Sequence, residues 1–174
     1  LTELSRRIRT QVAAAVAELP KDIQIFINLL PTDLNDDDLL SLSAPLSLIA
    51  DRVVLEITES EPLTVVRNLQ KRLKRLRMLG YRIAVDDLGE GHAGLNAFVQ
   101  LQPDIVKLDR CLIREIDQNN TRREVVGAMI ELCSNMDIQL IAEGIETPQE
   151  RDVLISLGAD WLQGYLFARP AKGF

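Results

Sequence analysis

The chain has little of what marks membrane-spanning, secreted or nucleic-acid-coating proteins. No apolar run approaches the roughly twenty residues of a membrane helix, and the first residues show no signal-peptide pattern. The formal net charge is −6 at pH 7. This charge disfavours a protein that coats DNA or RNA, because binding many phosphates requires a basic surface. A small phosphorylated ligand held through metal ions remains compatible with it.

Cysteine and histidine are scarce as well. The two cysteines, Cys111 and Cys133, lack the spacing of a metal or redox motif, so we expect both to be reduced and buried. The single histidine, His92, follows a glycine-rich turn, where a surface position is expected rather than a catalytic base. The composition is otherwise that of a globular protein, with 47% apolar and 26% charged residues in 174 positions. The chain is one domain, or part of one, with a substantial core.

Short apolar segments alternate with segments of helical periodicity along the chain. We predict strands over residues 23–28, 53–57, 82–86, 105–108, 139–143 and 160–163. Each delivers a polar side chain near its C-terminal end: Asn28, Glu56, Asp86, Lys107, Glu143 and Gln163. Such alternation favours a parallel sheet covered by helices. In a parallel barrel all these strand ends open on one face, so the six polar groups are predicted to converge there.

The number of strands is smaller than such a barrel needs. A complete barrel of this type has eight strands, whereas six are visible here and the chain begins with a helical pattern. We therefore predict a TIM-like parallel α/β barrel that lacks its first strands. The missing sector would be supplied by an N-terminal portion outside this sequence, or by another chain or segment.

Asp86 and Asp87 are the most unusual pair in the sequence. Adjacent carboxylates at a strand end repel each other and lose hydration, which a neighbouring cation would relieve. Hard oxygen ligands of this kind suit Mg²⁺, Mn²⁺ or Ca²⁺. The residues by themselves favour this interpretation and a solvated turn about equally.

Four helices are predicted between the strands, over residues 2–19, 62–79 and 121–136 and from Thr147 onward. Thr121 with Glu124, and Thr147 before Pro148, have the pattern of helix starts. The three acids at 36–38 are interpreted as a solvated helix N-terminus rather than a metal site. The basic residues between 67 and 77 are interpreted as a solvated helix face.

Six motifs in order resemble the EAL family, the bacterial cyclic di-GMP phosphodiesterases. They are Phe26-Ile27-Asn28-Leu29, Leu55-Glu56-Ile57-Thr58-Glu59-Ser60, Asp86-Asp87-Leu88-Gly89, Lys107-Leu108-Asp109, Ala142-Glu143-Gly144-Ile145-Glu146-Thr147 and Gln163-Gly164-Tyr165. Each motif is weak alone, but the ordered set is specific. The resemblance covers nearly the whole chain and implies one EAL domain over residues 1–174, N-terminally incomplete.

The resemblance also implies roles for individual residues. The metal ligands it implies are Asn28, Glu56, Asp86, Asp87 and Glu143. Lys107 would help to hold the attacking water and the phosphate charge, Glu143 would take part in catalysis, and Gln163 would support the water or metal site. Glu59 would brace the loop after Asp87, and Glu146 would have a supporting role in the motif that follows Glu143.

The implied reaction is metal-dependent hydrolysis of cyclic di-GMP to linear pGpG. Hydrolysis of a phosphodiester needs an activated water, charge neutralisation and a stabilised leaving oxygen, which two Mg²⁺ or Mn²⁺ ions about 3.5–4 Å apart can supply. Two alternatives stay open. One is an inactive EAL domain acting as a cyclic di-GMP receptor or protein-interaction module, and the other is an unrelated Mg²⁺-dependent barrel enzyme.

Two departures from the family pattern bear on activity. The Glu-Ala-Leu segment, whose glutamate is a metal ligand in the family, does not occur in these 174 residues. In the loop after Asp87, Glu90 stands where a small hydroxyl residue is usual, and His92 where an aromatic residue is usual. Glu90 is expected to repel Glu59 unless a cation or water intervenes.

The resemblance implies the surroundings of the domain too. Its ligand would be cyclic di-GMP rather than a DNA or RNA polymer, and the domain would form a homodimer. We expect fused sensory or GGDEF-type domains in the parent protein. We also expect the domain to lie in the cytoplasm, whether or not the parent protein is attached to a membrane.

Overall fold

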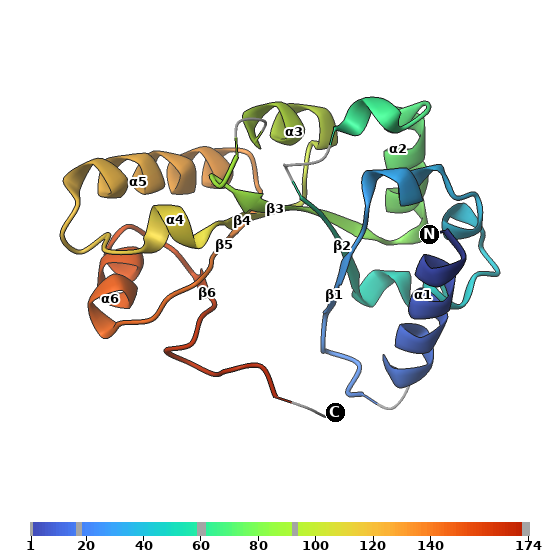
Figure 1. The fold of residues 1–174 in the computed structure, drawn as a ribbon, viewed down its shortest axis with the longest axis horizontal. Helices are drawn as coiled ribbons and strands as arrows, with labels where there is room; N and C mark the ends of the chain where they lie inside the picture. The colour runs from blue at the N-terminus through green and yellow to red at the C-terminus, as the bar shows by residue number, and fades with distance from the viewer. Residues whose placement is uncertain (1, 17–18, 59–61, 92–93, 172–174) are drawn as a thin grey trace.

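Six parallel strands and their connecting helices make up the computed structural model, which describes residues 2–16, 19–58, 62–91 and 94–171 (Figure 1). The strands are β1 (Ile25–Asn28), β2 (Val53–Thr58), β3 (Arg82–Leu88), β4 (Ile105–Leu108), β5 (Gln139–Ala142) and β6 (Trp161–Leu162). The helices are α1 (Thr2–Val16), α2 (Leu69–Leu79), α3 (Gly94–Leu101), α4 (Arg110–Ile113), α5 (Asn120–Asn135) and α6 (Pro148–Ser156). Short 3₁₀ helices cover Pro31–Asn35, Asp38–Leu40, Pro45–Arg52 and Leu63–Val65.

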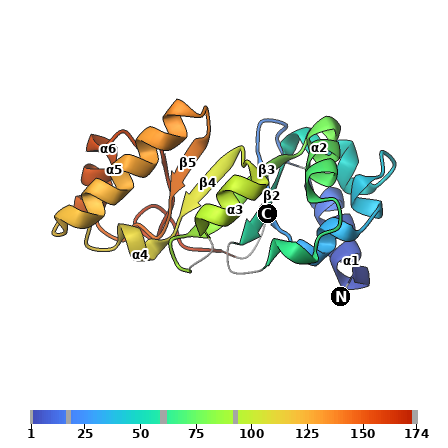
Figure 2. The ribbon, with the colours of Figure 1, turned by 90° about the horizontal axis from the view of Figure 1, so that it is seen from above.

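The sheet is a partial barrel. Its strands follow one another in chain order from β1 to β6, and every neighbouring pair is parallel. In Figure 1 the strands curve into an arc, with α2, α3 and α5 along its outer side. Viewed from above in Figure 2, α1 and α2 lie at one end of the arc and α4, α5 and α6 at the other. The predicted parallel α/β barrel with missing strands is thereby confirmed.

The two faces of the sheet bury different residues, because side chains alternate along a strand. The face under the helices belongs to the main core and includes Leu55, Ile57, Ile83, Val85, Val106 and Leu108. The other face carries a small apolar cluster of Val54, Ala84, Ile105 and Ile141. Two residues further along the same strands stand Glu56, Asp86, Lys107 and Glu143. A buried apolar layer therefore lies beneath a layer of charged groups.

Two predicted helix boundaries are wrong. The helix expected over 62–79 is interrupted at Asn68, whose left-handed backbone (φ 53°) separates a 3₁₀ turn from α2. The helix expected from Thr121 starts at Asn120, because the Asn119 side chain accepts the N–H of Arg122 and caps the helix. The side-chain cap of Asn119 thus decides the start of α5, whereas Asn68 makes no side-chain cap and interrupts the helix through its left-handed backbone.

Other expectations are confirmed, apart from the end of α1. Helix α6 begins with Pro148, and Thr147 and Glu150 form a complete capping box. Helix α1 is described from Thr2 to Val16, but Leu19, the expected last residue of this helix, is not helical. Within the described part of the chain, no helix combines the length and apolar character needed to cross a membrane.

The expected solvation of the acids at 36–38 is wrong for Asp36. Its side chain is 1% exposed and contacts Arg6 at 2.6 Å and Arg9 at 2.5 Å. Asp37, in contrast, is exposed and pairs with Arg72. Hydrogen bonding to Arg6, helped by Asp38 N–H and Arg9 and opposed by burial, lowers the Asp36 pKa to about 2. This ion pair ties α1 to the segment after β1.

The expectation for the cysteines is half right. Cys133 is buried in the core, but Cys111 is exposed, and its Sγ donates to the carbonyl oxygen of Gly89 at 3.1 Å. Both thiols are free. Burial raises the pKa of each to about 11, with Asp109 adding to the effect at Cys111. A high pKa disfavours the reactive thiolate, in line with the expected inert role.

Replacing Asp36 with asparagine should lower the free energy of unfolding at pH 7 by about 3–5 kcal/mol, because buried Arg9 loses its countercharge. The folded-state pKa of Asp36 lies below its ordinary value of 3.8. Its contribution is therefore complete above about pH 4 and disappears as the pH falls towards 2. Urea unfolding of both proteins between pH 7 and 2.5 measures this. The control, Asp37→Asn at an exposed pair, should change stability by less than about 1 kcal/mol. Equal losses in the two variants would contradict the assignment.

Candidate metal centre

Three carboxylates from different strands meet at one ammonium group. Lys107 Nζ, at the end of β4, lies 2.5 Å from Glu56 Oε1, 2.9 Å from Asp86 Oδ1 and 2.8 Å from Glu143 Oε1. The side chains of all four residues are at most 15% exposed. The prediction that these strand ends converge is confirmed for the four residues, which come from β2, β3, β4 and the end of β5.

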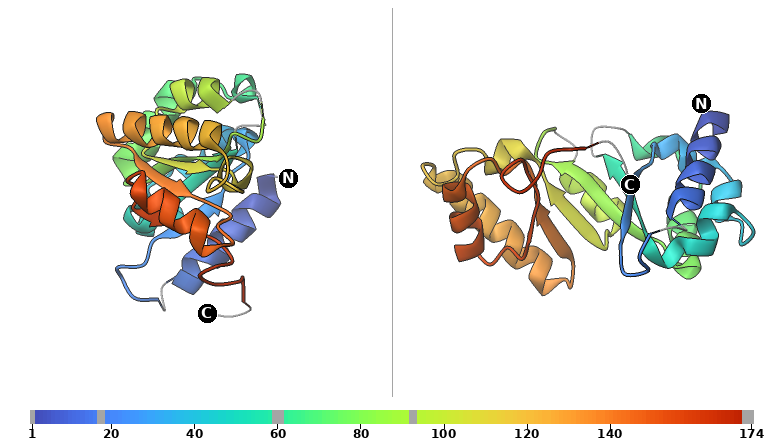
Figure 3. Two further views of the ribbon diagram at one scale, coloured as in Figure 1. Left: turned by 90° about the vertical axis from the view of Figure 1, so that its left-hand side faces the viewer. Right: turned by 90° about the horizontal axis from the view of Figure 1, so that it is seen from below.

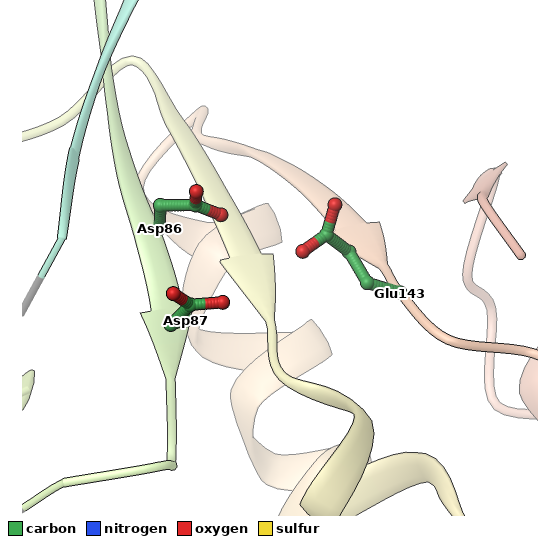
Figure 4. Close-up of side chains that lie close together, drawn as sticks. All are labelled: Asp86, Asp87 and Glu143. Atoms are coloured by element: carbon green, nitrogen blue, oxygen red, sulfur yellow. The ribbon is translucent and has the colours of Figure 1, made fainter. Parts of the chain in front are cut away.

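Asp87 joins this group through an irregularity in β3. In a regular strand, Asp86 and Asp87 would point to opposite faces. The register between β3 and β4 shifts between Val85 and Leu88, and Asp87 has a left-handed backbone with φ 56°. The carboxylates of Asp86, Asp87 and Glu143 therefore gather over β4 (Figure 4), each offering an oxygen within 4.8 Å of the others. Bulges of this kind commonly re-aim side chains beside functional sites.

The electrostatics of the cluster favour an added cation. Burial raises the pKa of Glu56 and of Glu143, although Lys107 opposes the rise. Burial also raises the pKa of Asp87, and repulsion by Asp86, Asp109 and Glu90 adds to it. Burial lowers the pKa of Lys107, but its three carboxylate partners outweigh this and the net shift is upward. One permanent ammonium thus faces four carboxylates.

This donor set fits a hard divalent ion. Asp86, Asp87 and Glu143 supply converging oxygens, and Glu56 adds a fourth carboxylate beside Lys107. Mg²⁺ and Mn²⁺ prefer such oxygen ligands. A bound ion would offset the surplus negative charge and so oppose the rise in the pKa of Glu56, Asp87 and Glu143.

Asn28 and Gln163, the remaining strand-end residues of the prediction, lie at the two edges of the sheet. Asn28 ends β1, is exposed, and is in register with Glu56 of β2. Gln163 follows β6, and its N–H donates to the Ala142 carbonyl oxygen. Gln163 also lines a cavity of about 270 Å³ beside the cluster, with Asp109, Arg110, Glu143, Gly144, Glu146, Gly164 and Tyr165. A larger hollow of about 720 Å³ lies at the opposite strand ends, around Arg82 and Trp161.

The supporting acids are only partly placed. Glu146 pairs with Arg110 at 2.9 Å on the wall of the smaller cavity. Glu59 and His92 fall outside the described residues, so the expected repulsion between Glu59 and Glu90 stays a prediction. Glu90 itself is exposed, and its N–H donates to the Asp87 carbonyl oxygen.

Several residues that shape the site were given no role by the sequence. Arg110 is one, although it directly follows the motif around Lys107. Gly164 is another, since a Cβ there would lie 2.1 Å from the Ile145 carbonyl oxygen. The glycine lets the segment after β6 run against the segment after β5. In the sequence, the only sign of this role was the position of Gly164 next to Gln163.

Comparison with known proteins identifies relatives. The family model of the EAL domain matches residues 1–170. The blue light- and temperature-regulated antirepressor BluF of Escherichia coli is 35% identical over 153 residues, which are 85% of this chain and 38% of that protein. The cyclic di-GMP phosphodiesterase RocR of Pseudomonas aeruginosa is 30% identical over 159 residues, 89% of this chain and 41% of that protein.

Solved structures give the same result. A complex of Klebsiella pneumoniae BlrP1 with manganese and cyclic di-GMP superposes with a TM-score of 0.87 at 34% identity, covering 98% of this chain and 45% of that one. The chain thus spans less than half the length of these three relatives. With the model match over nearly all its residues, the chain belongs to the EAL domain family.

Proposed function

We propose that this domain hydrolyses cyclic di-GMP to linear pGpG with Mg²⁺ or Mn²⁺. The observation that carries the proposal is the meeting of Glu56, Asp86 and Glu143 at Lys107, with Asp87 turned towards them. Related proteins are named cyclic di-GMP phosphodiesterases, and BlrP1 was solved with manganese and cyclic di-GMP.

In this proposal the metal ligands are Asn28, Glu56, Asp86, Asp87 and Glu143. When bound, the ions would supply charge neutralisation at the phosphate and a more acidic water. Lys107 would keep its proton, since its pKa is raised. Its ammonium group would then stabilise the negative charge that develops on the phosphate during hydrolysis. Its contacts also fix the directions of three carboxylates.

The remaining residues would have supporting roles. Gln163 would hold water or orient the metal site from the cavity wall, and Glu146 would do so through Arg110. Glu59 would brace the loop after Asp87. Such supporting groups typically change metal affinity or activity by about 10–100-fold when removed.

The receptor alternative has its own support. Glu90 departs from the family pattern in the loop after Asp87, and a relative with 35% identity is named an antirepressor. In addition, Lys107 already pairs with three carboxylates, which partly balances their charge. A domain with these features would bind cyclic di-GMP or a protein without cleaving the nucleotide.

We also propose the wider setting of the domain. Residues 1–174 would belong to one EAL domain whose remaining strands close the arc between β1 and β6. Exposed Leu95 and Val99, one turn apart on α3, support a homodimer. The greater length of the relatives supports fused sensory or GGDEF-type domains. Two free thiols support a cytoplasmic location.

Replacing Asp86 with asparagine should weaken Mn²⁺ binding by at least about 100-fold, because a charged ligand is lost. This loss would exceed the effect expected from removing a residue that only supports the ligands. Isothermal titration calorimetry on the whole protein measures this. Glu90→Gln, which removes a nearby exposed charge, is the control and should stay within about threefold. Unchanged binding in the Asp86 variant would mean that these acids are not the metal site.

Replacing Glu143 or Lys107 with alanine should lower kcat for cyclic di-GMP by about 10²–10³-fold, because each acts on the developing charge. Production of linear dinucleotide, followed by chromatography, measures the rate, and circular dichroism checks folding. Lack of turnover by the unaltered whole protein, with nucleotide binding retained, would favour the receptor function instead.

Replacing Leu95 and Val99 together with glutamate should convert the dimer to a monomer, because two like charges would face each other across the interface. Light scattering after size-exclusion chromatography gives the mass. Met78→Glu, at an exposed position of α2, is the control and should leave the mass unchanged. A dimer that survives the double change would place the interface elsewhere.

A further inference from the structure

Glu150 is a buried carboxylate outside the candidate metal centre. It lies in the first turn of α6 and is 5% exposed. It does not belong to the residues that contact Lys107 or line the neighbouring cavity. No basic partner of Glu150 appears among the ion pairs of the described residues, so backbone groups must stabilise its charge.

Three backbone N–H groups from two separate segments donate to this one carboxylate. The N–H of Glu115 donates to Oε1 at 3.0 Å, and those of Glu146 and Thr147 donate to Oε2, each at 3.0 Å. A capping box needs only the bond from Thr147, the residue before the helix. The other two bonds connect the turn between α4 and α5 to the segment that follows β5. These elements share one end of the arc, where Figure 3 also shows α6.

The geometry requires a carboxylate rather than an amide. Burial raises the Glu150 pKa, but the hydrogen bonds from Glu146, Glu115 and Thr147 outweigh it and the pKa is lowered. The group is therefore ionised, with both oxygens accepting. A glutamine would keep one accepting oxygen and turn an NH₂ group towards the other N–H donors.

The segment held by Glu150 is the one that carries Glu143. Residues 143–147 leave the end of β5 and pass between α4 and the segment after β6. On one side, Ile145 N–H donates to the Gln163 carbonyl oxygen. On the other side, Gly144 has φ +70°, and a Cβ there would lie 2.5 Å from Arg110 Cβ. Glu146 then pairs with Arg110. These contacts hold the segment on both sides, and Glu150 holds its end at Glu146 and Thr147. The segment that carries Glu143 therefore has little freedom to move.

We propose that Glu150 is a positioning residue that holds the segments after β4 and β5 together and thereby fixes the directions of Glu143 and Glu146. The inference rests on the proposed metal-dependent function of the same site. Glu150 would act without touching metal or substrate. It would orient Glu143, the proposed ligand just after β5, relative to Lys107 on β4.

The experiment compares Glu150→Gln with Thr147→Ala in the whole protein. Thr147→Ala removes the hydroxyl that accepts the Glu150 N–H at 3.2 Å, so it damages the same helix start but leaves the three bonds to the carboxylate. Mn²⁺ affinity is measured by electron paramagnetic resonance, and amide hydrogen exchange by mass spectrometry. Glu150→Gln should weaken Mn²⁺ binding at least tenfold and speed exchange around Glu115 and Glu146. Thr147→Ala should do neither.

Two results would overturn the inference: unchanged exchange in Glu150→Gln, or equal losses of Mn²⁺ affinity in both variants. A wild-type protein that binds no Mn²⁺ would refute the proposed function instead, and exchange alone would then decide on the positioning role. If Glu150→Gln does not fold, Glu150→Asp serves in its place. It keeps the charge and the capping position but is too short to reach both segments, so the same two changes are expected.

Discussion

A single ammonium group holds together the charged layer of this domain. Lys107 reaches carboxylates from β2, β3 and the end of β5, and all of them are withdrawn from water. Buried carboxylates at such separations would repel one another and take up protons without a cation. The lysine therefore makes the arrangement stable enough to exist, and divalent ions would complete the neutralisation.

The sheet makes this concentration of charge possible. A buried apolar layer lies two residues below the charged one and consists of Val54, Ala84, Ile105 and Ile141. The opposite face of the sheet packs into the main core. Strands buried on both sides are rigid supports, so the side chains at their ends are held in fixed directions. The register shift in β3 adds Asp87 to the group as a fourth carboxylate.

Hydrogen bonds outside the charged layer hold the connecting segments. Gly164 allows the segment after β6 to contact Ile145, and Glu150 joins the segment after β5 to the turn after α4. Metal sites and active sites in proteins commonly depend on supporting groups that never touch the metal or the reactants. The comparison with EAL domains of related proteins identifies the family of the chain, whereas these contacts describe how this particular chain builds its site.

The sequence by itself determined the strand order and much of the site. Alternating apolar runs and helical periods specify a parallel sheet, and polar residues at strand ends must share one face, which is why Glu56, Asp86, Lys107 and Glu143 could be predicted. Only the tertiary structure decided the rest. Asp36 is buried because Arg9 of a distant helix meets it, Asp87 turns inward through a register shift, and Glu150 collects N–H groups from two segments. These three features depend on contacts between residues far apart in the chain or on a single backbone angle. Such contacts and angles leave no periodic pattern in the sequence, so the sequence alone did not predict them.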